Sequence, residues 1–397
     1  MTFSLIVFFA LFLISTKYLR NAILSHRYMF KQNTLIRGKI RNDVIVLLPV
    51  YQEVQIITQT FDYFDRVSSR LNVKIIFITT KLEGIASKNA THLALKKIVG
   101  KNSNILLEHC PKMHGSKAGQ LNWIMEKYKN QTDYFAIFDA DSRPDYKGIQ
   151  YVMRSNKKPA VFQMPSIYLS HMSNSLASKT IAVFQTSWSF CFEIPKWRSW
   201  QDNSCNPHVM YLVGHGLFLK NNIRLSERTI TEDIEVGYRL SAQRATMVCV
   251  PFFDKAFVPK NFIDAIIQSS RWYYGELMAP ITFRKYFKNS NKIIHYSYLC
   301  LIRYSQILLW LFGPFMIIIG LIKAITFMPL FLFGLCCIGL YWTLDVFICS
   351  YIYASYDSLI LMPIKFITNG IGPLLCVSYV IIDRLKIKEF KFVKTKR

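Results

Sequence analysis

Two aspartates stand two residues apart directly after a short apolar run, in the segment Phe138-Asp139-Ala140-Asp141. The run Tyr134–Phe138 has the composition of a buried strand. Where such a strand ends the chain bends, so one carboxylate is able to reach a divalent cation while the other contacts a ribose or a water of the same metal. Mg²⁺ and Mn²⁺ take oxygen ligands from one or two carboxylates together with substrate phosphates. The pair therefore predicts metal-assisted chemistry on a phosphate-bearing substrate, although such pairs also occur in solvated loops.

Two upstream segments carry groups suited to a nucleotide. Pro49-Val50-Tyr51-Gln52-Glu53 follows an apolar run, which places an aromatic ring and a carboxylate where a base can be contacted. The alternative is an ordinary strand-to-helix turn with Glu53 near a helix N-terminus. Lys117 lies in His114-Gly115-Ser116-Lys117-Ala118-Gly119-Gln120-Leu121-Asn122, among small residues that let a backbone approach phosphate closely. A solvated lysine at a helix start is the alternative for this segment.

Two downstream segments combine acidic, basic and aromatic side chains. Thr231-Glu232-Asp233 precedes the helical stretch Ile234–Leu240, so its acids either act chemically or cap the helix. Gln268, Arg271 and Trp272 fall within about one helical turn. Arginine suits bidentate phosphate contact, and tryptophan suits stacking on a sugar face. An interfacial amphipathic helix is the alternative for these three residues.

A histidine between two glycines, Gly214-His215-Gly216, ends the apolar run Tyr211–Val213. It would border an acceptor site, although a lone histidine is more often structural. The nine cysteines show neither a CxxC pair nor a Cys/His ligand spacing. The sequence therefore indicates neither a structural zinc nor a disulfide scaffold.

From about Arg41 to Tyr274 the pattern is that of an α/β domain with a mainly parallel sheet, because short β-branched or aromatic runs alternate with helical stretches. In such sheets ligands bind beyond the carboxyl ends of the strands. The predicted strands are Val44–Leu48, Val73–Thr79, Ile105–Leu107, Tyr134–Phe138 and Val161–Met164, and helices are expected over Gln59–Ser69 and Lys117–Lys127.

The N-terminus predicts a membrane anchor. Residues 2–16 carry no charge, and Lys17 and Arg20 follow them. A secretory signal would carry its charge before the apolar run and a small-residue cleavage site after it. The positive-inside rule places the chain after the anchor in the cytoplasm. Because the run is shorter than a full span, a partly inserted helix is the alternative.

The chain after Arg303 is apolar again as far as Ile382, with segments near 304–322, 325–350 and 360–382. The tail from Asp383 is basic, which predicts that it is cytoplasmic. With the middle of the chain also inside, this block must cross the membrane an even number of times. Either the stretch 325–358 divides into two spans or one segment is re-entrant.

Composition agrees with a membrane protein. Hydrophobic residues make up 52% of the chain and charged residues 18%, which is too apolar for an ordinary soluble enzyme. The net charge is nevertheless +25, so the basic excess is expected to lie mostly outside the spans, where it is available to anionic lipid headgroups or a negatively charged substrate. Without a zinc-finger spacing, an RNA-recognition signature or a long central basic run, nucleic acid is not expected as a partner.

In their order and spacing the motifs resemble those of processive family 2 glycosyltransferases, the group that contains cellulose, chitin and hyaluronan synthases. Gln268 follows Asp233 by 35 residues, as the resemblance requires, and the strand Phe162–Pro165 and the membrane block after Trp272 also fit. The resemblance covers about residues 40–383. The matching pieces are Pro49–Glu53, Lys117–Asn122, Asp139–Asp141, Thr231–Asp233 and Gln268–Trp272.

The resemblance implies a GT-A type, Rossmann-like catalytic domain and gives roles by position. Asp141, with Asp139, would hold Mg²⁺ or Mn²⁺, and Asp139 would also contact the nucleotide. Asp233 would be the general base that takes a proton from the acceptor hydroxyl. Lys117 and Arg271 would balance the departing diphosphate. The other implied contacts are with the acceptor, at Glu232, Gln268, Trp272 and His215, and with the donor, at Pro49, Tyr51, Glu53 and Thr80.

One departure concerns the base of the donor. After its second strand the family usually carries a pair of aspartates, one of which reads uracil, whereas this chain has Ile78-Thr79-Thr80-Lys81. Threonine can hydrogen-bond a base but supplies no carboxylate, so the assignment of uridine is weakened. Gln52, where the family commonly has asparagine, is a milder change.

The predicted protein is a membrane-bound inverting glycosyltransferase, hexosyl- or N-acetylhexosaminyl-transferring, that extends a β-linked polysaccharide from a nucleotide-diphosphate sugar, by resemblance a UDP-sugar. A single transfer to a membrane lipid acceptor is the alternative, and a catalytically silent membrane partner is the third. The expected location is the inner or plasma membrane, multi-pass and in contact with lipids, with a cytoplasmic catalytic domain; the sequence is silent on an export or regulatory subunit.

The expected parts are an anchor over 1–22, the GT-A domain over 40–275, an interfacial segment over 276–297, three or four transmembrane helices over 298–383 and a basic tail over 384–397.

Overall fold

The computed structural model describes residues 1–31, 38–81, 90–100, 104–111, 116–171, 174–202, 212–227, 229, 231–278, 284 and 293–384. The chain forms two compact units. The sheet unit comprises Met29–Ser166 and Lys196–Ala256, and the helical unit comprises Met1–Tyr28, Ile167–Pro195 and Phe257–Arg397. Among the predicted features, His114, Gly115, most of the segment 276–297 and the tail after residue 384 lie outside the described residues.

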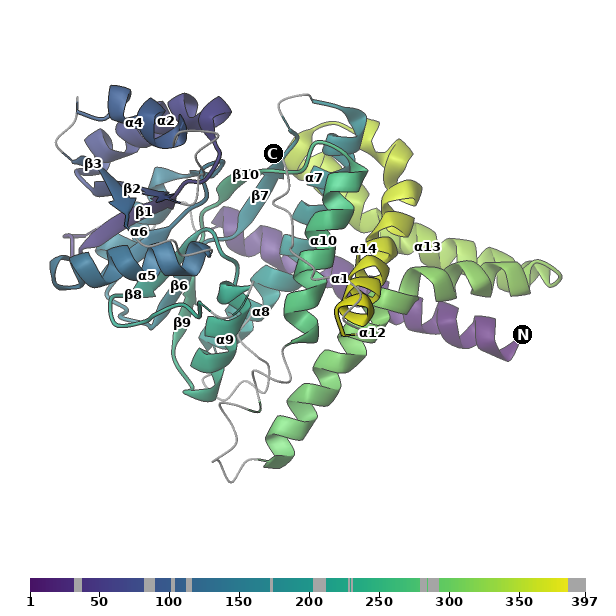
Figure 1. Ribbon diagram of the computed structural model, residues 1–397. Helices are drawn as coiled ribbons and strands as arrows, with labels where there is room; N and C mark the ends of the chain where they lie inside the picture. The colour runs from purple at the N-terminus through teal and green to yellow at the C-terminus, as the bar shows by residue number, and fades with distance from the viewer. Residues whose placement is uncertain are drawn as a thin grey trace. The chain divides into compact units, whose positions relative to one another are not determined.

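A seven-stranded mixed sheet forms the centre of the sheet unit, with strand order β3-β2-β1-β4-β8-β6-β9 (Figure 1). The first four strands in this order are parallel, and β8 runs antiparallel to both β4 and β6. Its strands are β1 (Val44–Pro49), β2 (Lys74–Thr80), β3 (Ile105–Cys110), β4 (Tyr134–Ile137), β6 (Val161–Gln163), β8 (Leu217–Lys220) and β9 (Met247–Cys249). A second sheet has the order β5-β10-β7, with β5 (Arg143–Pro144), β7 (Ser166–Leu169) and β10 (Asp254–Phe257).

The strand order reverses at β1, because β2 and β3 follow on one side of β1 while β4 pairs with the other side. The carboxyl ends of β1 and β4 therefore lie at a switch point, which is where open α/β sheets bind ligands. Strand β8 is antiparallel, so its first residue, Leu217, pairs with Ile137 at the end of β4. The loop before β8 thus reaches the same edge of the sheet.

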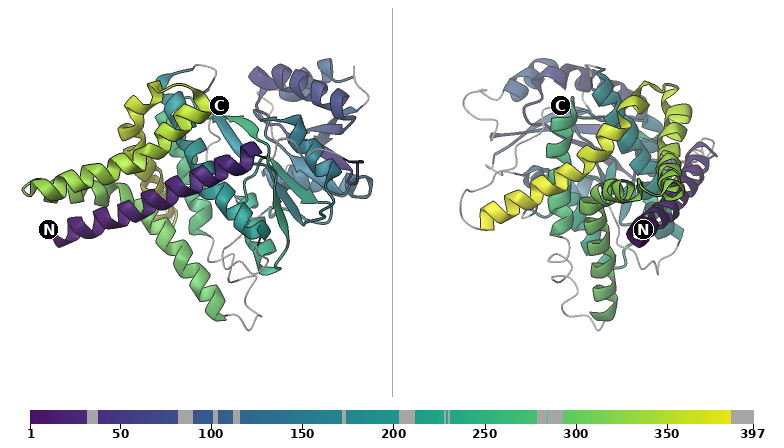
Figure 2. Two further views of the ribbon diagram at one scale, coloured as in Figure 1. Left: turned by 180° about the vertical axis from the view of Figure 1, so that it is seen from behind. Right: turned by 90° about the vertical axis from the view of Figure 1, so that its right-hand side faces the viewer.

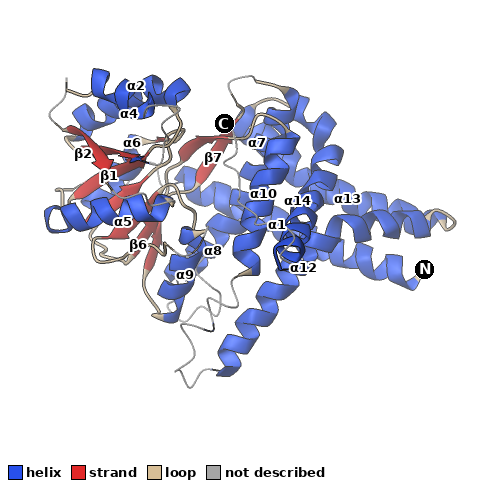
Figure 3. Ribbon diagram, viewed as in Figure 1, coloured by secondary structure: helices blue, strands red, loops and turns tan. Residues whose placement is uncertain are grey.

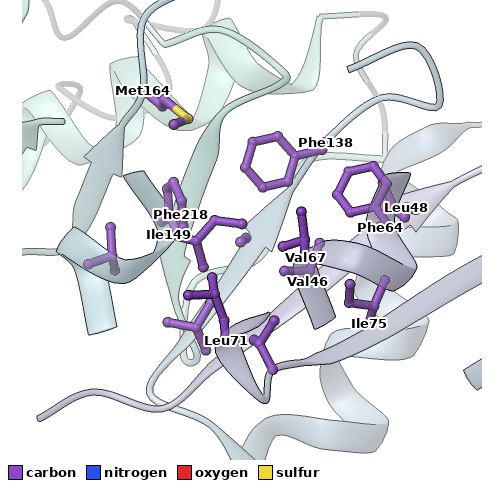
Figure 4. Packing of buried hydrophobic residues seen from close by; sticks show 14 of the residues in the cluster. Val46, Leu48, Phe64, Val67, Leu71, Ile75, Phe138, Ile149, Met164 and Phe218 are labelled. Atoms are coloured by element: carbon purple, nitrogen blue, oxygen red, sulfur yellow. The ribbon is translucent and has the colours of Figure 1, made fainter. Parts of the chain in front are cut away.

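Helices cover both faces of the sheet, because each strand buries its side chains on both sides. Val46, Ile75 and Phe138 belong to one face and pack with Phe64 and Ile149 from helices on that side (Figure 4). In Figure 3 helix α5 lies on the opposite side of β1 and β2 from α2 and α4. The helices of this unit include α2 (Val54–Leu71), α4 (Ala90–Ile98), α5 (Lys117–Tyr128), the short η2 (Lys129–Gln131), α6 (Tyr146–Arg154) and α9 (Glu232–Ala242); α8 (Ile194–Asp202) begins at the border of the units.

Long apolar helices dominate the helical unit. Over the described residues four of them are long and apolar enough to cross a membrane, namely Thr2–Phe30, Cys300–Ala324, Met328–Tyr353 and Asp357–Ile381. They belong to α1 (Thr2–Lys31), α12 (Ile293–Ala324), α13 (Met328–Ile348) with its extension η4 (Cys349–Tyr353), and η5 (Asp357–Leu361) with α14 (Met362–Arg384). The unit also holds α7 (Leu176–Trp188), η3 (Ser189–Glu193) and α10 (Phe262–Leu277).

Helix α1 runs alongside the hairpin of α12 and α13 (Figure 2). Phe8 is fully buried among residues of both helices, and Ser4 Oγ donates a hydrogen bond to Gly320 O at 2.9 Å. The helix continues to Lys31, well beyond the end predicted from its uncharged run. Lysine and arginine end the uncharged run, but they do not end the helix, because both residues have good helix propensity.

The predicted α/β class is confirmed, as are the membrane-capable helices at the N-terminus and in the C-terminal block. The predicted strands and helices of the sheet unit are present, with ends that differ by a few residues. Four of the five predicted strand runs are followed directly by proline or by an acidic residue, which marks their ends in the sequence.

Candidate active site

The segments predicted to hold the donor lie at the switch point of the sheet. Pro49 ends β1, and Glu53 immediately precedes α2, where its backbone N–H donates to Thr91 Oγ1 at 3.2 Å. Between them Gln52 has φ +56°, an uncommon left-handed conformation for a residue other than glycine. Phe138 N donates to Leu47 O at 3.1 Å, so the loop carrying the aspartate pair starts beside the end of β1.

The loop of the aspartate pair is fixed by its backbone. Ser142 N donates to Asp139 O at 3.0 Å, which closes a tight turn. Thr60 Oγ1 and Arg143 Nη1 both donate to Ala140 O, at 2.6 and 3.0 Å. Asp141 is 3% exposed, and burial lowers the pKa of Arg143 below its ordinary value although the charge of Asp141 opposes this shift. These bonds fix the backbone from which both aspartate side chains project.

Lys117 is the cation at the centre of the sheet-unit site. It begins α5, whose cap residue Ser116 accepts a hydrogen bond from Gly119 N at 3.2 Å. Its Nζ lies 2.6 Å from Asp139 Oδ1 and 2.8 Å from Gly214 O. Burial alone lowers the pKa of Lys117, but the charges of Asp139 and Glu232 outweigh it, and the pKa lies above its ordinary value. The residue is therefore a fixed positive charge.

Asp233 lies next to this lysine, in the first turn of α9. A Cβ atom built on Gly214 would lie 3.2 Å from Asp233 Oδ2 and 3.5 Å from Lys117 Nζ, so the three groups converge at Gly214. Burial raises the pKa of Asp233, and burial together with the charge of Asp233 raises the pKa of Glu232 to about 7. A carboxylate whose pKa burial raises binds a proton more readily than an exposed one, which suits general-base chemistry.

Gln163 holds the loop before β8 in place. Its Nε2 donates to His215 O at 2.9 Å and to Gly216 O at 3.2 Å, and its Oε1 accepts from Val213 N at 3.1 Å. Gly216 has φ +63°, and a Cβ there would lie 2.7 Å from Met164 O. Both the backbone conformation and the close approach therefore require glycine.

His215 is anchored by an aspartate that the sequence did not single out. Its Nδ1 lies 3.0 Å from Asp254 Oδ2 and 3.2 Å from Ser166 Oγ. Asp254 is fully buried and also accepts from Ser142 Oγ at 2.9 Å. Burial alone lowers the pKa of His215, but the hydrogen bond and charge of Asp254 raise it above its ordinary value. The network ties the loop of His215 to the loop of the aspartate pair.

At the end of β2, where an aspartate pair was expected, two histidines surround a threonine. Thr79 Oγ1 lies 2.9 Å from Nδ1 of both His92 and His109, whose rings meet edge to face with centroids 4.7 Å apart. The neighbouring Thr80 is buried. Because Thr91, next to His92, binds the backbone of Glu53, this cluster lies close to the predicted base pocket.

Gln268, Arg271 and Trp272 lie on α10 of the helical unit. Asn261 caps this helix by accepting from Asp264 N at 2.9 Å. Gln268 Oε1 accepts from Gln185 Nε2 of α7 at 2.8 Å, and Gln268 is 3% exposed. Trp272 is 37% exposed, so its indole is available for stacking.

The comparisons with known proteins agree with the resemblance. Residues 134–355, more than half of the chain, match the model of the family described as Glycosyl transferase family group 2. The chain belongs to this family. The match confirms the predicted enzyme class at the level of family, and it agrees with the GT-A type fold expected.

Three known proteins are similar to this chain over different lengths. The chain is 31% identical over 103 residues to the probable glucomannan 4-beta-mannosyltransferase 3 of Arabidopsis thaliana, which is 26% of this chain and only 18% of that protein. The mannosyltransferase PcManGT from Pyrobaculum calidifontis, solved with GDP-Man and Mn²⁺, is 12% identical with a TM-score of 0.49, over 92% of this chain and 99% of that one. S. aureus TarS 1–349 is 10% identical with a TM-score of 0.37, over 79% and 92%.

The aspartate pair of this family group 2 chain fits a divalent cation whose other ligands come from the substrate. Over the described residues, no cluster of three or more His, Cys, Asp or Glu side chains would form a cage made by protein alone. A cation held by one or two carboxylates and by substrate phosphates needs no such cage. Because Lys117 engages Asp139 Oδ1, Asp141 is the carboxylate that fits this role first, with Asp139 beside it.

The sequence reasoning missed the parts of the site that act through the backbone or across long separations. Gly214 contributes a carbonyl oxygen to Lys117, and Asp254 reaches His215 from a strand near the end of the unit. A signal existed for Asp254, an acid inside the apolar run 249–258. Asn122 is placed differently from a ligand contact, because it binds Leu225 N and O at 2.9 and 2.8 Å and so holds the chain before α9.

Proposed function

We propose that this chain transfers a sugar from a nucleotide-diphosphate donor to a hydroxyl acceptor with inversion at the anomeric carbon. The convergence of Lys117 Nζ on Asp139 Oδ1 and Gly214 O, with Asp233 Oδ2 beside Gly214, carries the proposal. It sets a cation for the leaving diphosphate and a carboxylate for the attacking hydroxyl within one small region at the carboxyl edge of the sheet.

The proposed reaction is a single displacement. The acceptor oxygen forms a bond to the anomeric carbon, and the bond from that carbon to the diphosphate oxygen breaks with its electron pair on the diphosphate. Asp233 takes the proton of the acceptor hydroxyl, because its raised pKa makes the carboxylate a stronger base than an exposed aspartate. Attack from the side opposite the leaving group inverts the centre.

Lys117 of the sheet unit would stabilise the charge of the leaving diphosphate. The resemblance implies the same role for Arg271 on α10. A divalent cation such as Mg²⁺ or Mn²⁺, held by Asp141 with Asp139, would supply Lewis-acid stabilisation of the same group when bound. Glu232, His215, Gln268 and Trp272 would hold the acceptor, as the resemblance implies. Pro49, Tyr51, Glu53 and Thr80 would line the nucleotide pocket.

Mannose is the sugar we propose first, because the relative from Arabidopsis thaliana is described as a mannosyltransferase. The identity of the donor's base is less constrained than that of its sugar. Thr79, His92 and His109 offer a hydroxyl and two imidazoles at the end of β2 instead of a carboxylate pair. This arrangement supports a test of GDP- and dTDP-sugars beside the UDP-sugars that the resemblance implies.

The acceptor is proposed to be a growing β-linked glycan at a membrane, with transfer of one sugar to a lipid as the second candidate. The membrane-capable helices support a multi-pass protein with its sheet unit in the cytoplasm. The length of the product separates the two candidates, because a product that carries one added sugar is incompatible with chain extension.

The test is a donor screen on membranes that contain the full chain. Labelled UDP-, GDP- and dTDP-sugars are supplied with Mg²⁺ or Mn²⁺, and incorporation into glycan or lipid is measured. Asp233→Asn should lower turnover by about 10²–10⁴-fold with donor binding largely retained, and Asp62→Asn, at an exposed acid on α2, should change neither. Turnover of no donor would sink the proposal, and a fully active Asp233→Asn would remove Asp233 as the base.

A further inference from the structure

The predicted acceptor motif on α10 is held by a glutamine from α7. Gln185 Nε2 donates to Gln268 Oε1 at 2.8 Å, and both helices belong to the helical unit. Gln185 is 7% exposed and Gln268 is 3% exposed, so the bond joins two amides in the interior of this unit. Over the described residues it is the one hydrogen bond that either side-chain amide makes. The direction of this bond therefore decides which end of Gln268 is left for a ligand.

The bond between the two amides has one favourable direction. As it stands, Gln185 Oε1 is buried without a hydrogen-bond partner. If both amides were turned over, Gln268 Nε2 would donate to that oxygen, and the N–H groups of Gln185 would be buried without an acceptor instead. A buried N–H without a partner is rarer in proteins than an under-satisfied carbonyl. The carbonyl oxygen of Gln268 is therefore engaged, and its N–H groups remain.

The amide nitrogen of Gln268 stays within reach of solvent, because it has no described partner and yet is not a fully buried atom. Trp272 follows one helical turn later and is 37% exposed. Residues four apart lie on the same face of a helix. This face of α10 thus combines an N–H donor with an exposed indole. A sugar matches the combination, because its C–H face stacks on an aromatic ring while its hydroxyl oxygens accept hydrogen bonds.

Packing alone does not account for an amide at Gln185. Two other α7 hydroxyls bond to membrane-capable segments, Thr180 Oγ1 to Ser358 O at 3.0 Å and Ser187 Oγ to Asp345 Oδ1 at 2.7 Å. Gln185 differs from them, because it keeps a buried oxygen unpaired, and such an atom destabilises the fold. An apolar side chain of the same size would fill this place without that cost. What the amide adds is its hold on Gln268.

We propose that Gln185 is a positioning residue for the acceptor. By donating to Gln268 Oε1 it turns Gln268 Nε2 toward the ligand, where this nitrogen donates to a hydroxyl oxygen of the terminal sugar of a β-linked glycan. The face of that sugar stacks on Trp272. The inference rests on the glycan acceptor of the proposed function, and it adds both the residue that orients Gln268 and the direction of the hydrogen bond to the sugar.

The test measures glycan binding to the full chain in detergent micelles by isothermal titration calorimetry. The probes are tetrasaccharides of β-linked mannose, glucose and N-acetylglucosamine, with no nucleotide sugar present. Gln185→Met keeps the length of the side chain but removes its amide, and it should weaken binding of the preferred tetrasaccharide about five- to tenfold. The matched control is Thr180→Val, which removes the bond from α7 to Ser358 O and should leave the affinity unchanged.

A double-variant cycle separates positioning from packing. Gln268→Met should weaken binding at least as much as Gln185→Met does. The double variant should bind no more weakly than Gln268→Met alone, because Gln185 acts through Gln268. Losses that multiply in the double variant would mean that Gln185 acts independently of Gln268, and they would overturn the proposal. A folded Gln185→Met that binds like the parent chain would overturn it as well.

Two further outcomes decide the proposal even if Gln185→Met does not fold. A parent chain that binds none of the three tetrasaccharides overturns it, and so does a Gln268→Met variant that binds them as tightly as the parent. A failed donor screen leaves the binding result standing, because no donor enters this assay. Conversely, donor turnover together with unchanged glycan binding in Gln185→Met would remove the positioning role and leave the proposed function intact.

Discussion

The side chains around Lys117 form a group in which acids outnumber bases. Asp139, Glu232 and Asp233 all raise the pKa of the one ammonium group. Burial raises the pKa of both Glu232 and Asp233, and the charge of Asp233 adds to the rise at Glu232. Carboxylates whose pKa is raised by burial are suited to receive a proton from an incoming hydroxyl. Because the acids around Lys117 outnumber the bases, a second cation would help to neutralise the added negative charge when a diphosphate binds.

The pH dependence follows from the acid pair. Activity should rise with pH as the pair loses its shared protons, because Asp233 must be a carboxylate to act as base. In Glu232→Gln one negative charge is gone, so Asp233 loses its proton more readily. The rising limb of kcat/KM should move to lower pH by roughly one unit. A limb that stays at the pH of the parent chain would contradict the coupling.

Stability gives an independent measure of the same pair. The pKa of Glu232 is about 7 in the folded chain, above its ordinary value of 4.5, so folding favours the protonated acid. This contribution is complete below pH 4.5 and is lost as pH rises through about 7. The thermal midpoint of Glu232→Gln, relative to that of the parent chain, should therefore rise as pH increases from 4.5 to about 7. Above about pH 7 the difference between the two midpoints should stay constant.

Single residues with a local signal were predictable, and those defined by distant contacts were not. Asp139, Lys117 and Asp233 stand at the ends of recognisable strands and helices, so their chemistry was visible in the sequence. Asp254 and His215 are 39 residues apart and meet only through the sheet. The pair of histidines at Thr79 likewise comes from separate elements, and no spacing rule connects them.

At the scale of elements, the site depends on one antiparallel strand. β8 pairs with both β4 and β6, so its preceding loop lies between the aspartate pair and Gln163. Short apolar runs predicted β4 and β6, whereas no strand was predicted at Leu217–Lys220. The pairing of β4 with β8 joins residues 80 to 86 positions apart, and local periodicity contains no information on such pairing.

Gly216→Ala tests this loop. The new Cβ would meet Met164 O at 2.7 Å in a left-handed backbone, so the loop must shift. Because Gly214 O binds Lys117, we expect turnover to fall at least about tenfold and stability to fall by about 1–3 kcal/mol. Turnover and a thermal unfolding curve check both. Full activity in this variant would mean that the loop does not position the lysine.

At the scale of the whole molecule, the helices supply large apolar surfaces that water would not tolerate. Leu5, Phe9, Leu308 and Leu332 are each about half exposed on three different membrane-capable helices. Exposed apolar area on this scale marks a surface in contact with lipid. Helix α1 packs closely against α12 and α13 because the ring of Phe8 fits against Gly320 and Gly334, which form a cradle without side chains.

That cradle provides a matched pair of variants within α13. A Cβ on Gly334 would lie 2.5 Å from the Phe8 ring, whereas a Cβ on Gly339 meets nothing within 4 Å. Gly334→Ala should therefore separate α1 from the hairpin and lower the thermal midpoint in detergent, at a cost of about 1–3 kcal/mol from overpacking. Gly339→Ala should be neutral or gain up to about 1 kcal/mol, since alanine is the better helix former. Equal thermal midpoints for the two variants would show that the packing of α1 does not depend on the cradle. A lowered midpoint in Gly334→Ala alone would show that α1 packs as a member of the membrane-capable helices and is not a separate anchor.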